Sequence, residues 1–284
     1  MNRKVVLITG ASSGFGLHAS LRFAERGHEV VATMRNPETK GELLDQAALL
    51  GVASRIHILR LDVTRTEDIR SVMREIGERF GRLDVLVNNA GYAVGGMAEE
   101  VPLSDWRALL ETNFFGVIAM TQAALPIMRS QRRGTILNVG SISGKIGIPG
   151  YAPYCSSKFA VEGFSESLRH EVRGFGVDVV LVEPGSYKTP IWNKGFDRIR
   201  AAPSSPYRDL LDSVLGYSRR TAEAAPDPDR LARKIVALAE KKSPSLRYAY
   251  GKGAKLSLLG KAILPWKWFE RVLAAALRAG MNKR

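Results

Sequence analysis

Tyr154 and Lys158 are residues whose types and spacing suit proton transfer. They are four positions apart, and apolar residues follow at helical spacing (159, 161, 164 and 168), so both side chains should share one face of a helix. A nearby ammonium favours phenolate and should lower the pKa of the tyrosine towards working pH, as acid/base catalysis requires. Ser141, after a predicted buried strand over 135–139, could hold a substrate oxygen. A half-buried tyrosine beside a solvated lysine is the alternative, so other motifs must decide.

A glycine-rich stretch has the pattern of a dinucleotide-binding turn. Residues 5–9 are a continuous apolar run, as expected for a strand buried on both faces of a parallel sheet, and residues 17–26 predict a helix. Gly10, Gly14 and Gly16 lie between them, in the spacing Thr-Gly-x-x-x-Gly-x-Gly. Glycines let the backbone approach a pyrophosphate, and the helix N-terminus offers N–H groups and a positive dipole end. A tight turn alone would account for one glycine but not for three.

The end of the second predicted strand, over residues 29–33, indicates which dinucleotide is bound. An acidic residue there would bind the ribose 2′-hydroxyl, but the first acid is Glu38, beyond Pro37. Arg35 stands nearby instead, and its guanidinium can grip a 2′-phosphate. We therefore predict that NADP is preferred and that NAD is also possible. The alternative is that Arg35 is a solvated surface residue.

Other polar residues follow strand ends or interrupt apolar faces. Asp62 lies at a strand's carboxyl end, where ligands of open α/β sheets bind, but it could instead cap the next helix. The run Asn-Asn-Ala-Gly at 88–91 can tie neighbouring strands and line a nucleotide cleft, or simply form a turn. Asn113 interrupts the apolar face of a helix predicted over 103–129, which indicates a buried hydrogen bond or a site.

A parallel sheet is the element that would bring these residues together. Strands and helices alternate along the chain, which predicts one Rossmann-type, doubly wound α/β domain over residues 1–251. It should have about seven mostly parallel strands, with helices on both faces. The strands are predicted at 5–9, 29–33, 55–61, 83–87, 135–139, 177–182 and 246–250. Pro184 and Gly185 turn the chain out of the sixth strand at the edge where ligands bind.

Two segments stand apart from this alternation. Residues 186–228 are irregular, with prolines and isolated aromatic residues, and we predict a lid that favours a lipophilic small-molecule substrate. A helical excursion without function is the alternative. Residues 252–284 carry eight Lys or Arg against one Glu, a net charge of +7 out of +14 for the chain. Pro265 should split this basic amphipathic extension into two helices, which either contact a membrane surface or pack beside a lipophilic pocket.

Composition excludes several classes of protein. The 45% hydrophobic and 25% charged residues are ordinary for a soluble globular protein, and the single cysteine, Cys155, fits a reducing cytosol. The four histidines lack ligand spacing, so we predict no metal. No signal peptide, spanning segment or nucleic-acid-binding motif is evident, so we predict no nucleic-acid partner. We expect a cytoplasmic protein, with association to a membrane surface through the tail as an open alternative.

Together, residues 3–251 resemble the short-chain dehydrogenase/reductase family. The matching motifs, in chain order, are the glycine turn, Asn-Asn-Ala-Gly at 88–91, Asn113, Ser141, Tyr154-x-x-x-Lys158 and Pro184-Gly185. Within the family the chain is most similar to the 17β-hydroxysteroid and retinol dehydrogenases. This narrower resemblance rests on residues 31–35, Gly140-Ser141, the stretch 154–163 and the extended tail.

The resemblance implies hydride transfer between a nicotinamide and a carbonyl or alcohol carbon. Tyr154 would be the acid/base, and Lys158 would lower its pKa and hydrogen-bond the nicotinamide ribose. Ser141 would orient the substrate oxygen, and Asn113 would hold a water in a proton relay. Ser143 is a rival to Ser141, but the thirteen-residue step from Ser141 to Tyr154 fits the family better. Tyr151 is not a rival, because Cys155 is at its i+4 position.

The resemblance also implies cofactor contacts and assembly. Dimers or tetramers would form through the two long helices flanking the site, and the tail could limit assembly to a dimer. Two alternatives are a catalytically silent nucleotide-binding scaffold and a peripheral membrane enzyme that modifies lipids with NAD(H). The implied contacts are Gly10, Ser12, Ser13, Gly14, Phe15 and Gly16 at the phosphates, Arg35 at the 2′-phosphate, Asp62 and Val63 at the adenine, Asn89 at the ribose with Ala90 and Gly91 in the same turn, and Pro184, Gly185 and Thr189 at the nicotinamide.

Overall fold

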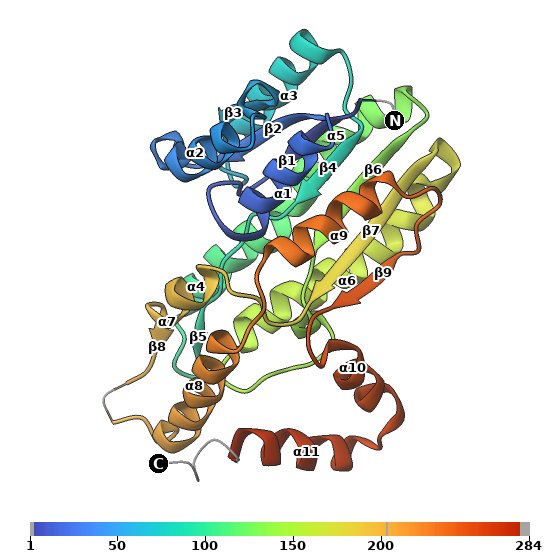
Figure 1. Cartoon of the computed structure of the whole chain (residues 1–284). Helices are drawn as coiled ribbons and strands as arrows, with labels where there is room; N and C mark the ends of the chain where they lie inside the picture. The colour runs from blue at the N-terminus through green and yellow to red at the C-terminus, as the bar shows by residue number, and fades with distance from the viewer. Residues whose placement is uncertain (1–2, 203, 279–284) are drawn as a thin grey trace.

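A seven-stranded parallel sheet forms the centre of the computed structural model, which describes residues 3–202 and 204–278 (Figure 1). The strand order is β3-β2-β1-β4-β6-β7-β9, and every neighbouring pair is parallel. Each predicted strand is confirmed within two residues at either end. The strands are β1 Val5–Ile8, β2 Glu29–Met34, β3 Ile56–Arg60, β4 Val85–Asn88, β6 Gly134–Val139, β7 Val177–Pro184 and β9 Arg247–Tyr250.

Helices cover both faces of the sheet, as predicted for a doubly wound α/β fold. Alternate residues of strand β1 point to opposite faces of the sheet. Val6 and Ile8 belong to the core on one side, and Val5 and Leu7 belong to the core on the other. Such strands read as continuous apolar runs, which is why they were recognisable in the sequence. The first core contains α1 (Gly14–Glu25), α2 (Gly41–Leu49) and α9 (Asp229–Glu240), and the second contains α3 (Thr66–Phe80), α5 (Gly116–Ser130) and α6 (Ala152–Val172).

The helix predicted over 103–129 is interrupted. It consists of α4 (Leu103–Leu110), a π-helical turn over Glu111–Phe115, and α5. By length and hydropathy, Leu103–Ser130 is the one helix in the described ranges that could cross a membrane. In this fold Met120, Ala124 and Met128 on its inner face are fully buried in the core. Short 3-10 turns lie at Pro37–Lys40, Ala53–Arg55, Ile142–Gly144 and Arg173–Phe175.

The segment 186–228 is not irregular, which corrects the sequence-based description. It contains α7 (Ile191–Phe196), the two-residue strand β8 (Ile199–Arg200) and the sixteen-residue helix α8 (Arg208–Glu223). Leu211, Val214 and Ser218 are buried at helical spacing, a pattern that the prolines around the helix obscured. Strand β8 pairs in parallel with β5 (Gly95–Gly96), so the segment is attached to the loop after β4.

Two helices follow β9 and lie below the sheet, drawn in red in Figure 1. They are α10 (Ala254–Ile263) and α11 (Trp266–Arg278). Pro265 separates them, as predicted, because proline cannot continue a helix with normal hydrogen bonding. Residues 279–284 of the predicted extension, including Lys283 and Arg284, lie outside the described residues.

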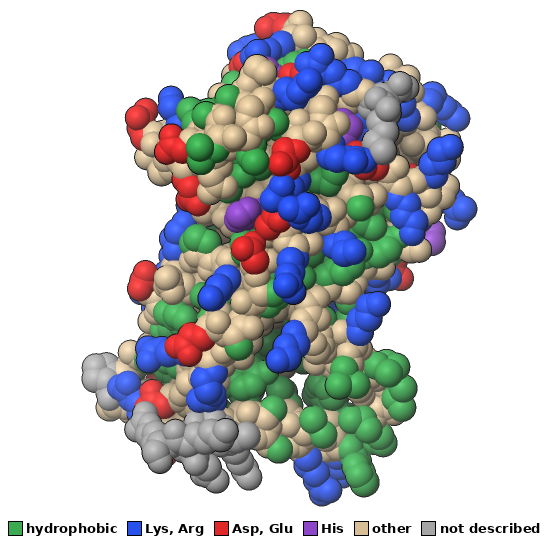
Figure 2. Space-filling view, in the orientation of Figure 1, with side chains coloured by type: hydrophobic (Ala, Val, Ile, Leu, Met, Phe, Trp, Pro, Cys, Tyr) green, Lys and Arg blue, Asp and Glu red, His purple; other side chains and the backbone are tan. Residues whose placement is uncertain are grey.

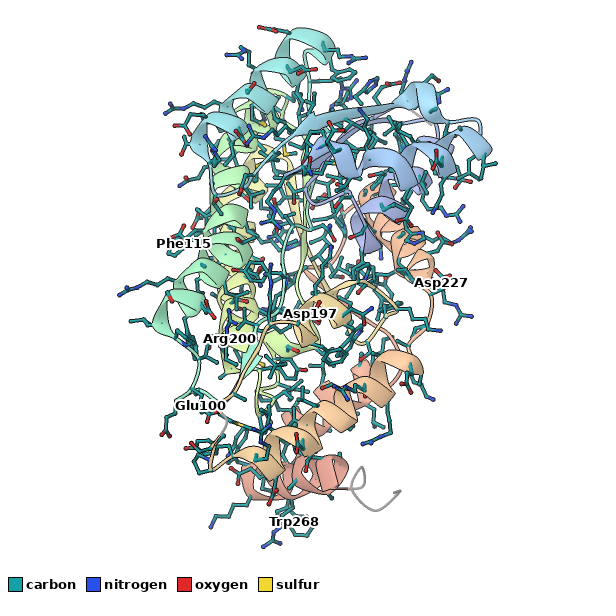
Figure 3. The ribbon with its side chains drawn as sticks, turned by 90° about the vertical axis from the view of Figure 1, so that its left-hand side faces the viewer. Glu100, Phe115, Asp197, Arg200, Asp227 and Trp268 are labelled. Carbon is teal, nitrogen blue, oxygen red and sulfur yellow. The ribbon has the colours of Figure 1, made fainter. Side chains whose placement is uncertain are left out.

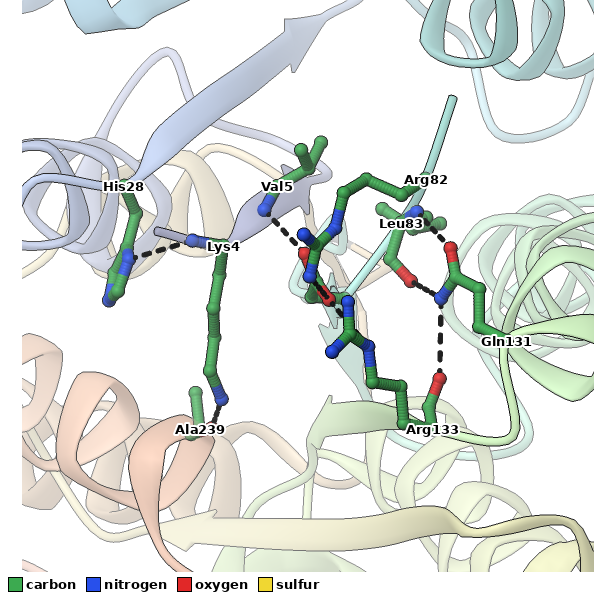
Figure 4. Close-up of polar contacts among 9 residues, drawn as sticks. Lys4, Val5, His28, Arg82, Leu83, Gln131, Arg133 and Ala239 are labelled. Atoms are coloured by element: carbon green, nitrogen blue, oxygen red, sulfur yellow. Dashed lines mark hydrogen bonds and ion pairs between the residues drawn. The ribbon is translucent and has the colours of Figure 1, made fainter. Parts of the chain in front are cut away.

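Polar contacts fix the amino ends of the central strands (Figure 4). The backbone N–H of Lys4 donates to His28 Nδ1 at 3.2 Å, and that of Val5 donates to Asp84 Oδ2 at 2.9 Å. Gln131 Nε2 donates to the backbone carbonyl of Leu83 at 2.8 Å. The polar groups at the amino end of the sheet therefore bind one another. The glycine turn, Tyr154 and Lys158 lie at the opposite, carboxyl end.

Candidate active site

Thr9 and Asn89 join the carboxyl ends of β1 and β4. The Thr9 hydroxyl accepts from the backbone N–H groups of Asn89 and Ala90, at 3.0 and 2.9 Å. Asn89 Nδ2 in turn donates to the backbone carbonyls of Thr9 and Gly10, at 2.9 and 3.0 Å. Asn89 therefore ties neighbouring strands, one of the two roles that its position predicts. The buried Thr9 is therefore a positioning residue, and its place in the motif before Gly10 was its only signal in the sequence.

The glycine turn has the geometry of an anion cradle. Gly10 and Gly14 have φ angles of +68° and +57°, which glycine adopts without strain. A Cβ on Gly16 would lie 2.3 Å from the carbonyl oxygen of Gly10, so this close approach also requires glycine. Ser13, the N-cap of α1, makes no side-chain capping bond, and the first turn has no acidic residue. The N–H groups and the dipole at this helix start thus fit the pyrophosphate of a dinucleotide.

The first residues of the segment 186–228 lie against this turn. A Cβ on Gly14 would stand 3.4 Å from the Thr189 side chain, so Thr189 lies against the glycine turn. The ring of Phe15 meets that of Tyr187 edge to face, with 5.4 Å between centres. Gly185, just after β7, donates its N–H to the Tyr250 carbonyl at 2.7 Å. The segment therefore starts between the glycine turn and the end of the sheet.

Arg35 and Asp62 lie at the ends of the adjacent strands β2 and β3. Arg35 is exposed, and no hydrogen bond or ion pair involves it within the described ranges. Burial alone would raise the pKa of Asp62, but hydrogen bonds from Thr64 and the charges of Arg35 and Arg65 hold it below its usual value. Asp62 accepts from the Thr64 backbone and hydroxyl at 3.0 and 2.8 Å and does not cap α3, whose N-cap is Arg65. Asp62 is thus left at the ligand edge.

Val63 and Gly91 pack closely against the helices that flank the site. A Cβ on Gly116 would come within 2.6 Å of Val63 Cγ2, so Val63 is pressed against the start of α5. A Cβ on Gly91 would lie 3.1 Å from Asn113 Oδ1. Both predicted contact residues therefore line the boundary between the sheet edge and α5.

Tyr154 and Lys158 project from the first turns of α6 towards the end of β6. Lys158 Nζ donates to the backbone carbonyl of Val139, the last residue of β6, at 2.8 Å, and lies 5.8 Å from the Tyr154 ring centre. The Ser141 side chain lies close enough to Tyr154 to oppose part of the rise in its pKa, and the Ser141 hydroxyl accepts the Ser143 N–H at 3.1 Å. The structure therefore brings Ser141, Tyr154 and Lys158 together, as predicted.

The pKa of Tyr154 differs from the sequence-based prediction. Burial raises it to about 12, and the hydrogen bond with Ser141 opposes this only in part. Burial also lowers the pKa of Lys158 to about 8. The predicted lowering of the tyrosine pKa is therefore wrong for this structure. The reason is that burial removes the phenolate from water, which costs free energy. The Lys158 ammonium, 5.8 Å from the ring centre, stabilises the phenolate by less than this cost.

Asn113 lies in the π-helical turn and is almost fully buried. Its Nδ2 donates to the Tyr92 carbonyl at 2.9 Å and to Ser157 Oγ at 3.1 Å, and its Oδ1 accepts the Tyr92 N–H at 3.1 Å. The prediction of a buried hydrogen bond is confirmed, and the side chain links the loop after β4 to α6. The π turn itself was missed. Such turns occur frequently at functional sites, and an asparagine in an apolar helix was its only signal.

A buried acid pair lies behind the serine loop, and it was also missed. Burial and, after it, the neighbouring Glu162 raise the pKa of Glu183 to about 7. Glu162 is paired with Lys145 Nζ at 3.1 Å and Arg247 Nε at 3.2 Å. Glu183 precedes Pro184 at the end of β7, so this pair supports the floor of the site. Across the described ranges, no group of three or more His, Cys, Asp or Glu residues could hold a metal ion.

Contacts from 186–228 cover the other side of the site. The Arg198 guanidinium lies 4.4 Å from the Tyr92 ring centre, and Arg200 pairs with Asp105 at 2.6 Å. Arg200 is labelled in Figure 3 on the stretch between α7 and α8. The Tyr151 hydroxyl donates to Ser218 Oγ on α8 at 3.2 Å, so Tyr151 faces this segment. These contacts hold the segment 186–228 against the loop after β4, α4 and the start of α6.

Comparison with known proteins places this arrangement among oxidoreductases. The short chain dehydrogenase family model matches residues 4–199. An uncharacterized oxidoreductase, YusZ, of Bacillus subtilis is 44% identical over 98% of this chain and 99% of its own length. A 3-ketodihydrosphingosine reductase of Bacteroides thetaiotaomicron is 36% identical over 88% and 89%. Mouse 17-beta-hydroxysteroid dehydrogenase type 1 is 36% identical over 87% of this chain and 74% of its own length.

Solved structures with the same fold contain nicotinamide dinucleotides. A short chain dehydrogenase/reductase from Burkholderia phymatum, in complex with NAD, has a TM-score of 0.79 and 26% identity, covering 95% of each chain. The closed form of a serine dehydrogenase complexed with NADP+ has a TM-score of 0.75 and 30% identity, covering 87% of this chain and 94% of that one. These likenesses support a nicotinamide dinucleotide as the cofactor.

Proposed function

Because the chain belongs to the short-chain dehydrogenase family, we propose that it is an NADP(H)-dependent oxidoreductase that interconverts an alcohol and its carbonyl on a lipophilic substrate. The family resemblance is confirmed, and so is the narrower one, because hydroxysteroid and retinol dehydrogenases are both among the relatives. The observation that carries the proposal is the grouping of Ser141, Tyr154 and Lys158 at the carboxyl edge of the sheet, beside the glycine turn.

Tyr154 is the proposed acid/base. With a pKa near 12 the phenol keeps its proton at neutral pH, so it can donate to the oxygen of a carbonyl that is being reduced. Lys158 stabilises the phenolate that results through its positive charge, and it is held in place by the Val139 carbonyl. The Ser141 hydroxyl orients the substrate oxygen. A bound nicotinamide supplies the hydride in reduction and accepts it in oxidation.

Asn113, in the π turn, is proposed to help hold a water molecule of the proton relay. Its side chain is occupied by Tyr92 and Ser157, which fixes the loop after β4 against α6. A π turn shifts the helical hydrogen-bond pattern by one residue and leaves backbone groups available to water. A relay water at this turn would connect the buried Lys158 ammonium with solvent.

NADP(H) is the proposed cofactor because of Arg35. Its guanidinium is exposed at the end of β2, and no acidic residue of that strand end is available for a ribose 2′-hydroxyl. Related proteins have been solved with NAD and with NADP+, so the choice rests on this residue. The glycine turn would hold the pyrophosphate, Asp62 and Val63 would border the adenine, and Thr189 would border the nicotinamide.

The surroundings of Tyr154 favour a lipophilic substrate. Its ring belongs to an apolar cluster with Val94, Val101, Leu109 and Trp106, which would expel water around a bound hydrocarbon. Two relatives, the 3-ketodihydrosphingosine reductase and the 17-beta-hydroxysteroid dehydrogenase, are named for lipophilic substrates of this kind. Steroids, retinoids and long-chain ketones are therefore the classes to test.

We also propose a cytoplasmic homo-oligomer. Phe115, at the end of the π turn, and Phe159 on α6 are 49% and 42% exposed, so the helices flanking the site present large apolar side chains (Figure 3 labels Phe115). Exposed apolar groups of this kind favour association between copies. Sedimentation velocity of the purified chain tests this proposal, and a strictly monomeric species at all concentrations would contradict it.

The test of the catalytic proposal is a carbonyl screen. The purified chain is mixed with NADPH or NADH and with retinal, androstenedione or a long-chain ketone, and loss of reduced nicotinamide absorbance is followed. We expect turnover with at least one carbonyl and a faster rate with NADPH. Tight nucleotide binding without turnover on any carbonyl or alcohol would favour a catalytically silent scaffold instead.

A further inference from the structure

A cavity with a volume of about 870 Å³ lies under helix α11. Its walls come from the loop 147–149, the outer face of α6, α8 and α11. This volume is within the range of small-molecule binding sites in proteins. The walls are mainly apolar and include Ile148, Phe159, Leu210, Phe269, Leu273 and Leu277.

This cavity is separate from the catalytic group. Helix α6 contributes Ala152 and Cys155 to its wall, whereas Tyr154 and Lys158 are not among the lining residues. Gly150 lies on the other side of α8, where a Cβ would be 3.4 Å from Val214 Cγ1, and Val214 is fully buried. Neither reacting group therefore borders the cavity.

The cavity is elongated, because α11 lines it from Trp266 to Leu277. At a rise of 1.5 Å per residue this stretch is about 16 Å long. Phe269 and Leu277 face inwards and are 8% and 5% exposed, whereas Trp268 lies on the outer side of the helix (Figure 3). An elongated apolar space between helices suits an extended hydrocarbon chain better than a compact ring system.

Lys261 provides a cation at one end of the cavity. Its ammonium lies 5.1 Å from the ring centre of Phe159 and 5.9 Å from that of Trp266, and both rings line the cavity. It donates to the backbone carbonyl of Lys145 and has no carboxylate partner among the residues that the structure describes. The acidic residues Asp209 and Glu270 also line the cavity, but both are exposed, so water solvates their carboxylates.

We propose that this cavity binds a single-chain anionic amphiphile, with the hydrocarbon chain along α11 and a carboxylate head at Lys261. The apolar walls account for the chain, and the Lys261 ammonium, which has no carboxylate partner in the described ranges, accounts for the sign of the head group. The site is independent of hydride transfer, and it would remain if the proposed reaction proved wrong. Two other occupants are outcomes of the test: a membrane surface, which the exposed apolar side chains of α10 could contact (Figure 2), and a second copy of the chain.

The test is calorimetric titration of the full-length chain with dodecanoate below its micelle concentration. Dodecyltrimethylammonium has the same chain with a cationic head and serves as the head-group control. We expect dodecanoate to bind at least about tenfold more tightly. Lys261→Met should weaken dodecanoate binding about tenfold and leave the cationic probe unaffected, and Lys261→Arg should restore the affinity. Equal affinity for the two heads would overturn the proposal.

A cavity-filling pair of variants locates the site. Ala274 lines the cavity, and its neighbour Ala275 is exposed on the same helix. Ala274→Trp should abolish dodecanoate binding, whereas Ala275→Trp should retain it. NADPH binding by each variant checks that the fold is intact. If Ala274→Trp does not fold, the comparison of the two head groups on wild type and Lys261→Met still tests whether the cavity binds the amphiphile.

Vesicle and association measurements separate the other occupants. Binding to phosphatidylglycerol vesicles without any binding of monomeric dodecanoate would mean that the tail docks on a membrane, and the proposal would be wrong. A change from dimer to monomer in Ala274→Trp but not in Ala275→Trp, without dodecanoate binding to the wild type, would mean that a second copy covers the cavity. Either result would overturn the proposed amphiphile site.

Discussion

The ammonium of Lys158 lies 5.8 Å from the ring centre of Tyr154 and is held by a 2.8 Å hydrogen bond to the Val139 carbonyl. The end of strand β6 therefore sets the position of the charge relative to the phenol. Both groups are largely shielded from water, so burial dominates their titration: the pKa is about 12 for Tyr154 and about 8 for Lys158. At neutral pH the phenol is protonated and the amine is charged.

Tyr154→Phe should abolish turnover and leave NADPH affinity within about twofold. Loss of a positioned acid/base lowers rates by about 10²–10⁴-fold, whereas the cofactor contacts of the glycine turn are untouched. Tyr151→Phe is the matched control, because that hydroxyl contacts only Ser218 in the described structure, and it should keep most of the activity. Steady-state rates and fluorescence titration with NADPH measure both effects. Comparable turnover by the two variants would remove Tyr154 from the mechanism.

Ser141→Ala should reduce kcat by about 10²-fold, since a hydrogen bond to the developing charge on the substrate oxygen is lost. Ser143→Ala should cost only a few fold, because it is the Ser143 backbone N–H that donates to Ser141 Oγ, and alanine keeps that group. Rates of the two variants on one carbonyl substrate decide between the rival serines. The reverse order of effects would transfer the substrate-orienting role to Ser143.

Arg35→Ala should weaken NADPH binding about tenfold or more and leave NADH binding unchanged. The reason is that only NADPH has the 2′-phosphate with which the guanidinium would form charge-assisted hydrogen bonds. Arg70→Ala removes another exposed positive charge, on α3, and controls for the general effect of charge. Fluorescence titrations of wild type and both variants with NADPH and NADH, at constant ionic strength, give the six affinities. If wild type binds both nucleotides equally, Arg35 is a surface residue and the preference for NADP is wrong.

Lys158→Met should stabilise the fold at pH 7 by about 1–2 kcal/mol while turnover is lost. The folded pKa of Lys158 is about 8, below the ordinary 10.5, so the folded state binds fewer protons than the unfolded state between these values. The free energy of unfolding of the wild type should therefore rise between pH 8 and pH 10.5 because of Lys158. Below pH 8 the lysine is charged in both states, and the destabilisation by its buried charge is greatest.

Denaturant unfolding of Lys158→Met at pH 7 and pH 10 measures the gain, which should shrink at the higher pH. Lys145→Met is the control, because it breaks an ion pair with Glu162 and should not stabilise. A Lys158→Met variant that is less stable than wild type at pH 7 would show that the ammonium is well compensated in the fold.

Glu183→Gln should stabilise the protein above pH 7 by about 1–3 kcal/mol. The folded pKa of Glu183 is raised from 4.5 to about 7, so its stabilising contribution is complete below pH 4.5 and is lost as the pH rises through 7. Glutamine stays neutral and avoids this loss. Unfolding free energies at pH 5 and pH 8 test the sign, and the variant should gain only at pH 8. Glu166→Gln, at an exposed partner of Arg247, should show no such gain.

The sequence by itself determined the sheet and most of the candidate site. Continuous apolar runs such as 5–8 and 179–182 specify strands buried on both faces. The carboxyl ends of the sheet's strands carry Thr9, Asn89, Ser141 and Pro184. The glycine turn and the i, i+4 spacing of Tyr154 and Lys158 are local features, so they were legible without tertiary contacts.

Only the tertiary structure decided how these groups behave. The pKa of Tyr154 rises instead of falling, because burial depends on neighbours that are distant in sequence. The same reason hid the interaction of Glu162 with Glu183, and it hid the π turn that links Asn113 to Tyr92. The cavity under α11 exists only because the loop 147–149, α8 and α11 meet beside α6. A pattern of residue types specifies which side chains share an element, whereas desolvation and enclosure depend on how the elements pack.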